Sequence, residues 1–187
     1  AGEFIRTKVV PEVDAVRFAS YASASGIMAA TAANLSDGAG VLAAIRTAKS
    51  TLDSNEVSET GRFLFITPAL YDLIEALATT KSREILNSFE AIVTVPQSRF
   101  FTAVTLAYGT TEGETAGGYS KGASASNINF MIIQRDAVLQ YTKHAEPKVI
   151  LPSENQTADA YKFGYRIYGL NDTYENKVSG IYLHKGA

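Results

Sequence analysis

The chain of 187 residues contains no cysteine. This absence excludes disulfide bonds and thiolate zinc sites, and it suits a protein made in a reducing cytoplasm. No stretch approaches the roughly 20 apolar residues of a transmembrane helix, and the first residues lack the charged-then-apolar pattern of a secretory signal. We therefore expect no membrane partner.

An excess of positive charge is also missing. Lysine and arginine number 17 against 19 acidic residues, which gives a formal net charge of -2. Surfaces that bind nucleic acid usually carry a basic excess, so we expect contact with DNA to be local and non-specific. The length and the 46% hydrophobic content suit one folding unit of mixed α and β structure.

The first strong helix signal is Pro11, which suits a first helical turn because it lacks a backbone N–H. Glu12 and Asp14 follow, where carboxylates offset the positive end of the helix dipole. Small residues and a sparse apolar stripe continue to about Ala33. We expect one long helix over this stretch, with a possible break at Gly26 because glycine weakens a helix interior.

The middle of the chain contains several shorter elements. Helical spacing after the capping signal at residues 36–38 predicts a second helix that ends near Ser54. Residues 62–66 read as a buried strand, and Thr67-Pro68 then begins a helix that extends to Leu77. Further expected elements are a short helix at 83–87, strands at 91–95, 129–133 and 137–141, an edge piece at 148–151, an undecided segment at 100–108 and a mobile loop at 109–127.

Residues 157–185 are rich in aromatic and β-branched side chains. Tyr161, Phe163, Tyr165 and Ile167 recur at every second position, which predicts one face of a half-buried strand. Turn chemistry at 171–172 then predicts a returning strand over residues 178–183. We expect the N-terminal helix to cover the face of this strand pair.

No catalytic group stands out. The two histidines, His144 and His184, lack neighbouring ligands at metal-site spacing, so neither is assigned to a metal. The glycine-rich stretch 113–122 lacks the lysine and hydroxyl ending of a phosphate loop, and a surface loop is the simpler interpretation. The pairs Glu12/Asp14 and Glu56/Glu59 read as solvated charges. We expect no enzyme activity, no metal and no cofactor.

The aromatic residues near the C-terminus admit two interpretations. They could form a stacking platform for bases or sugars, but such platforms for nucleic acid accompany a basic groove. We favour core packing or contact between subunits, because buried cores and interface anchors both use aromatic side chains. The positions assigned to these structural or interface roles are Tyr21, Tyr161, Arg166 and Tyr182.

Three blocks of sequence carry a resemblance to a known family. RTKVVPEVDA at 6–15, followed by Phe18 and Tyr21, resembles the start of the spine helix in major capsid proteins of tailed bacteriophages. RFLFITPALY at 62–71 resembles a strand and helix of the family's axial domain. YRIYG at 165–169 and GIY at 180–182 resemble the closing strands of its peripheral domain.

The resemblance implies an α+β fold of the Hong Kong phage type, in which a spine helix lies on a peripheral β-sheet beside an axial domain. Residues 1–33 and 137–187 would form the peripheral domain, and 34–136 the axial domain with the loop 109–127. The implied function is that of a coat subunit. It would assemble in the bacterial cytoplasm as pentamers and hexamers into an icosahedral head around DNA, with scaffolding and portal proteins as possible partners.

The family's N-terminal arm and extended loop have no counterpart here, so we expect a truncated or processed form. Two alternatives remain. An encapsulin-type nanocompartment shell shares the same fold, and a small-molecule-binding α/β domain would place a pocket under the glycine-rich loop.

Overall fold

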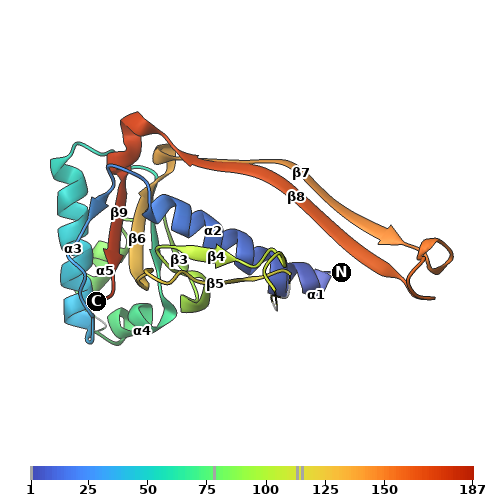
Figure 1. Cartoon of the computed structure of the whole chain (residues 1–187). Helices are drawn as coiled ribbons and strands as arrows, with labels where there is room; N and C mark the ends of the chain where they lie inside the picture. The colour runs from blue at the N-terminus through green and yellow to red at the C-terminus, as the bar shows by residue number, and fades with distance from the viewer. Residues whose placement is uncertain (1, 78, 113, 115) are drawn as a thin grey trace.

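A computed structural model describes residues 2–77, 79–112, 114 and 116–187 of the chain (Figure 1). The architecture is α+β, as the sequence predicts. Its elements are α1 (Gly2–Phe4), a π-helical segment (Ile5–Val9), α2 (Val10–Ala22), β1 (Met28–Ala29), α3 (Gly38–Ser54), β2 (Arg62–Ile66), α4 (Pro68–Leu77), α5 (Thr80–Leu86), β3 (Ala91–Thr94), β4 (Val104–Leu106), β5 (Tyr119–Lys121), β6 (Ile128–Gln134), β7 (Val138–Ile150), β8 (Lys162–Thr173) and β9 (Ile181–Lys185).

The N-terminal helix differs from the prediction at both ends. Helical residues begin at Gly2, ahead of Pro11, and α2 ends at Ala22 instead of continuing to Ala33. Gly26 adopts a φ of 89°, a left-handed conformation that breaks the helix near the expected place. The chain then runs as β1, whose Met28 pairs in parallel with Tyr182 of β9.

A five-stranded sheet forms the centre of the body, in the order β1-β9-β6-β2-β3. β2 runs parallel to β3 and antiparallel to β6, and β6 runs antiparallel to β9. The expected strands at 62–66, 91–95 and 129–133 are therefore confirmed within a residue or two. Because strand side chains alternate between faces, the sheet presents two apolar surfaces that both need cover.

Helices α3, α4 and α5 pack on one face of this sheet (Figure 1). The expected helices at 36–54 and 67–77 are confirmed, and α5 forms slightly before the expected range 83–87. The Asp37 side chain accepts a hydrogen bond from the Gly40 N–H at 2.9 Å and so caps α3. The apolar cluster between these helices and the sheet includes Val41, Ile45, Ala48, Leu52, Leu64, Ile66, Leu70, Ile74, Phe130, Ile132 and Tyr182.

The opposite face of the sheet packs against α2. Phe18 lies edge-on to Phe65 and Phe100, with ring centroids 5.3 and 4.8 Å apart. These aromatic contacts anchor the helix across the sheet. The buried members of this second cluster are Tyr21, Val95, Phe100, Ile128, Met131, Ile133, Ala137, Ile181 and Leu183.

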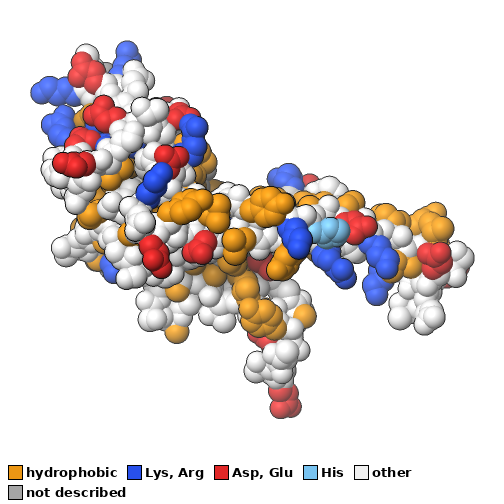
Figure 2. Space-filling model, turned by 90° about the horizontal axis from the view of Figure 1, so that it is seen from above, with side chains coloured by type: hydrophobic (Ala, Val, Ile, Leu, Met, Phe, Trp, Pro, Cys, Tyr) orange, Lys and Arg blue, Asp and Glu red, His pale blue; other side chains and the backbone are white. Residues whose placement is uncertain are grey.

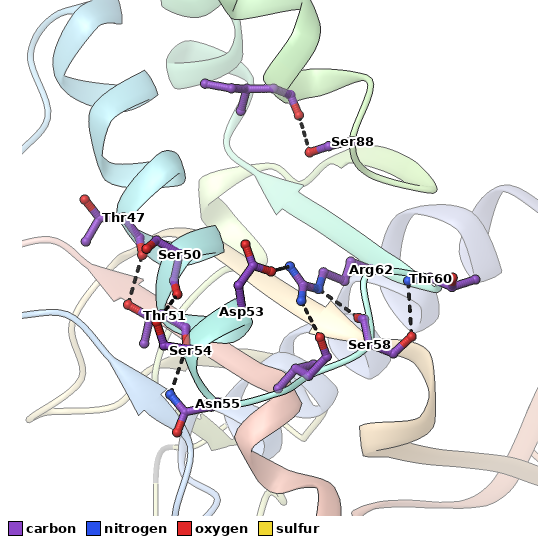
Figure 3. A network of polar contacts seen from close by, with 12 residues as sticks. Thr47, Ser50, Thr51, Asp53, Ser54, Asn55, Ser58, Thr60, Arg62 and Ser88 are labelled. Carbon is purple, nitrogen blue, oxygen red and sulfur yellow. Dashed lines mark hydrogen bonds and ion pairs between the residues drawn. The ribbon is translucent and has the colours of Figure 1, made fainter.

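Arg62 is buried at the start of β2, with only 1% of its side chain exposed (Figure 3). Its guanidinium donates to the carbonyl oxygens of Val57 and Ser58, at 2.5 and 2.9 Å, and to Asp53 Oδ1 at 2.7 Å. One planar group therefore ties the end of α3 and the following loop to β2.

The closing segment differs most from the expectation. Residues 161–167 and 178–183 do not pair with one another, because β8 pairs antiparallel with β7 along almost its whole length. Asn171 and Asp172 lie inside β8 instead of forming a turn, and β9 joins the central sheet. The expected segments 137–141 and 148–151 are the two ends of one continuous strand, β7, which runs from Val138 to Ile150 and leaves out only Ala137 and Leu151.

The glycine-rich tract at 109–127 is not throughout the loop that the sequence predicts, because it contains β5, which pairs antiparallel with β4 of the undecided segment 100–108. Glu12 of α2 accepts a hydrogen bond from the Gly118 N–H at 3.1 Å and so ties this second hairpin to the helix. Positions 113 and 115, which include the first residue of the rejected phosphate loop, lie outside the described residues.

Candidate assembly surface

The most unusual surface is the long hairpin, defined here as residues 138–173. It consists of β7 and β8, joined by a turn with a short 3-10 helix at Pro152–Glu154, and it projects well away from the body (Figure 1). The register shifts between Thr142 and His144, which marks a bulge at Lys143. A bulge bends and twists a ribbon.

Most of the large apolar side chains that the described residues expose lie on this hairpin or at its ends. They are Tyr141, Val149, Leu151, Tyr161, Phe163, Ile167, Tyr168, Leu170 and Tyr174, against four elsewhere. A two-stranded ribbon is marginally stable on its own, and contiguous exposed apolar surface is typical of interaction sites. The predicted half-buried strand is therefore an exposed one.

The pairing register divides the hairpin into two faces, because residues directly opposite one another point to the same side. We call one the helix-side face, since its residues line two hollows together with the N-terminal helix. Its members along the outer part of the hairpin are Ala145, Pro147, Val149, Phe163, Tyr165 and Ile167. All of these side chains are apolar or aromatic, so this face is the more hydrophobic one.

The other side is called the outer face. It carries apolar and charged side chains in alternation, as the colours along the projecting arm in Figure 2 show. His144 Nε2 lies 3.0 Å from a Glu146 carboxylate oxygen. The members of this face are Tyr141, His144, Glu146, Lys148, Ile150, Lys162, Gly164, Arg166, Tyr168 and Leu170.

The N-terminal helix covers only the base of the hairpin. Val13 and Val16 of α2 share a small cavity of about 150 Å³ with Ile167 and Gly169. Farther out, Phe4 and Ile5 line a larger groove of about 540 Å³ together with residues 155–165 of the hairpin. The expected cover of the strand face by the helix is thus partial, and the outer part of the face lies open.

The four residues assigned to structural or interface roles fall into two groups. Tyr21 and Tyr182 are 2% and 4% exposed and lie in the apolar clusters on opposite faces of the central sheet. Burial raises the pKa of both phenols. Tyr161 and Arg166 lie on the exposed hairpin, Tyr161 with 60% of its surface accessible. The structure does not bring the four together.

The polar residues weighed for chemistry do not converge on a site. Asp14 pairs with Arg99 at 2.9 Å and so holds the loop after β3 against α2. His184 is buried in β9, where its ring stacks on Phe130 and its Nδ1 lies 3.1 Å from the Asn129 amide nitrogen. Among the described residues, no cluster of three or more His, Asp or Glu side chains is placed to hold a metal ion.

Sequence reasoning missed Phe4, which is 57% exposed beside the groove. Its only signal is an aromatic residue in a charged lead-in to the helix. Among the helices of the described part of the chain, none has the length and apolar character to cross a membrane.

Comparison with known proteins gives one kind of match. No family model matches the chain, and no curated protein does. A capsid structure of the cyanophage P-SCSP1u superposes with a TM-score of 0.57 at 13% identity, over 95% of this chain and 61% of that one. A structure of Mycobacterium phage Che8 gives a TM-score of 0.54 at 12% identity, over 94% and 58%. The chain spans about three fifths of the length of these structures, and its fold is similar to that of phage capsid proteins.

Proposed function

We propose that this chain is a major capsid subunit of a tailed bacteriophage, a non-enzymatic structural protein that self-assembles into an icosahedral head around the DNA genome. The observation that carries the proposal is the fold similarity to the cyanophage capsid structure along 95% of the chain. The resemblance of three sequence blocks to the Hong Kong phage-type family points the same way.

The long hairpin supports a role in self-association. Its helix-side face presents apolar side chains that the N-terminal helix leaves uncovered, and Phe163 is 59% exposed. Burial of apolar surface contributes roughly 25 cal/mol per Å², so contact with other copies would stabilise the hairpin as well as the assembly. A closed shell repeats each contact many times, and weak contacts therefore suffice.

The proposal includes a division into domains. Residues 1–33 and 137–187 form the peripheral domain and 34–136 the axial domain, with β1 and β9 as the peripheral segments that extend the axial sheet. It also includes pentamers and hexamers, assembly in the host cytoplasm, contact with scaffolding and portal proteins, non-specific contact with packaged DNA, and a mobile stretch within 109–127 in the free subunit.

Electron microscopy of the purified chain tests the proposal. We expect shells, sheets or rings of five and six subunits at high protein concentration. Phe163→Glu places a charge on the exposed helix-side face of the hairpin and should abolish them, whereas Phe163→Leu keeps an apolar side chain there and should assemble normally. Small oligomers alone under all conditions would contradict the proposal, and shells that carry an enzyme cargo would favour a nanocompartment.

A further inference from the structure

The two edges of the long hairpin are not equivalent, and the difference follows from its hydrogen-bond pattern. In an antiparallel ladder, pairs that exchange two backbone hydrogen bonds alternate with pairs whose N–H and C=O groups point outward. Pro147 lies opposite Tyr165 and has no N–H to donate. A proline in a sheet therefore belongs at an outward-pointing position.

A second observation assigns the neighbouring pair. A Cβ atom placed on Gly164 would lie 4.0 Å from the carbonyl oxygen of Lys148, the residue opposite. That carbonyl therefore points across the ladder, and Lys148 with Gly164 forms a hydrogen-bonded pair. It follows that Phe163, Tyr165 and Ile167 direct their backbone groups away from β7.

The outer edge of β7 is interrupted by Pro147, a residue that natural sheets use to prevent further pairing. The outer edge of β8 carries no such block. Phe163, Tyr165 and Ile167 each offer one donor and one acceptor there, and within the described part of the chain these groups make no backbone hydrogen bond outside their own ladder. An open edge of this kind is a template for strand addition.

We propose that β8 pairs antiparallel with β8 of a second copy of this chain, about a two-fold axis at Tyr165. The two hairpins then form one four-stranded sheet, β7-β8-β8-β7. The axis falls at Tyr165 because α2 shares a cavity with Ile167 and lies beside β8 from Gly169 to Asn171, which limits pairing beyond Tyr168. The free part of the strand is thus Lys162 to Tyr168, and its midpoint is Tyr165.

The side chains fit this register on both faces. On the helix-side face, Phe163 of each copy lies opposite Ile167 of the other, and the two Tyr165 rings adjoin. Pairs of aromatic with β-branched residues are among the favourable cross-strand contacts. On the outer face, Arg166 lies opposite Gly164, which has no side chain. No two like charges lie directly opposite one another across the new ladder, and the two Arg166 side chains, which are diagonal neighbours, each have Glu146 of their own hairpin opposite them.

The contacts at the two ends of the new ladder also favour this register. Lys162 of each copy lies opposite Tyr168 of the other, so an ammonium group faces an exposed aromatic ring. The same surface serves both copies, as a two-fold contact requires. The inference deepens the proposed assembly role and rests on it for the expectation that copies associate.

Cysteine cross-linking tests the register directly, because the natural chain contains no cysteine. Tyr165→Cys places two sulfur atoms across a hydrogen-bonded pair with a Cα separation of about 5.5 Å, which a disulfide spans. Tyr161→Cys is the matched control. It removes a tyrosine four residues away, and its two copies lie eight residues apart along the strand, or about 27 Å.

We expect the Tyr165→Cys protein to form a disulfide-linked dimer on mild oxidation, at least ten-fold more than the Tyr161→Cys protein, on a non-reducing gel. Equal cross-linking of both, or of neither, would overturn the proposal. A mixture of Phe163→Cys and Ile167→Cys chains gives a second measurement. It should form the mixed dimer, while each variant alone should not, and failure of the mixed dimer would count equally against the register.

Electron microscopy of the same samples separates this inference from the proposed function. Shells of the Tyr165→Cys protein that lack the disulfide cross-link would refute the strand pairing and leave the capsid role intact. Cross-linked dimers that never form larger assemblies would refute the capsid role and leave the pairing intact.

Discussion

Replacement of Arg62 by lysine is expected to destabilise the body by about 2 kcal/mol. The guanidinium donates three hydrogen bonds, to Val57, Ser58 and Asp53. A lysine ammonium retains the charge and most of the stem, but as a single point it cannot reach three separated acceptors. At least two bonds are lost, and an intramolecular hydrogen bond contributes roughly 1 kcal/mol to the net stability. The two together account for about 2 kcal/mol.

The contribution of the ion pair alone is expected to be smaller. Asp53 has a side chain that is 41% exposed, so solvent screens its attraction to Arg62. Exposed pairs contribute about 0–1 kcal/mol. Asp53→Ala should therefore cost less than half as much as Arg62→Lys, because it leaves the bonds to the Val57 and Ser58 carbonyl oxygens in place.

Urea unfolding followed by circular dichroism measures both variants. With a slope of about 2 kcal/mol per M, the midpoint should fall by about 1 M for Arg62→Lys and by less than 0.5 M for Asp53→Ala. Equal shifts would show that the charge pair, and not the bonds to the loop carbonyls, carries the stability. An unchanged midpoint for Arg62→Lys would refute the reasoning altogether.

Three further predictions concern single positions in the body. Burial lowers the pKa of His184 below its usual 6.5, so the unfolded chain binds the proton more readily. Protonation of His184 in the unfolded chain therefore lowers the free energy of unfolding as the pH falls below about 6.5, and it has no effect above that pH. Between about pH 7.5 and 5.5, the urea midpoint of the His184→Gln protein should change less with pH than that of the natural protein. Asp37→Ala removes the cap of α3 and should cost about 1 kcal/mol in the same assay, whereas Asp37→Asn should be nearly neutral. Gly38→Ala would place a Cβ 2.1 Å from the Leu73 carbonyl oxygen, so it should lower the thermal midpoint by several degrees through a loss of about 1–3 kcal/mol.

The elements that the sequence predicts well are those whose signals are local. The helix after Asp37 has a cap and regular apolar spacing, and the unit from Arg62 to Leu77 combines a short apolar strand with a proline at the first helical position. Such signals act within a few residues, so they survive in the folded chain. The early end of α2 is a partial exception. Gly26 indicated a break in the helix, but nothing indicated that the chain continues as the strand β1 after it.

Strand pairing was not predictable from the same kind of pattern. Asn171 and Asp172 have turn chemistry, yet they lie opposite Gln140 and Leu139 in the ladder. Pairing with a distant partner overrides a local turn preference, and nothing in the alternation of Tyr161 to Ile167 names that partner. The sequence therefore indicated a strand and assigned it to the wrong neighbour.

The burial of the candidate residues could not be predicted from the sequence either. An alternating aromatic strand suits a half-buried position, and it suits equally well an exposed ribbon that awaits a partner. Tyr161, one residue before β8, belongs to the second case, and Tyr182 of β9 belongs to the first. The environment of His184 depends on Asn129 and Phe130, which lie far earlier in the chain and which the sheet brings close.

The position of β9 has a consequence for biosynthesis. This strand lies between β1 and β6, while the whole hairpin is inserted between β6 and β9. During translation the sheet has a gap at its middle until residues 181–185 emerge from the ribosome, and β1 has no neighbour to pair with before then. The nascent chain thus completes its central sheet only after the long hairpin has been made.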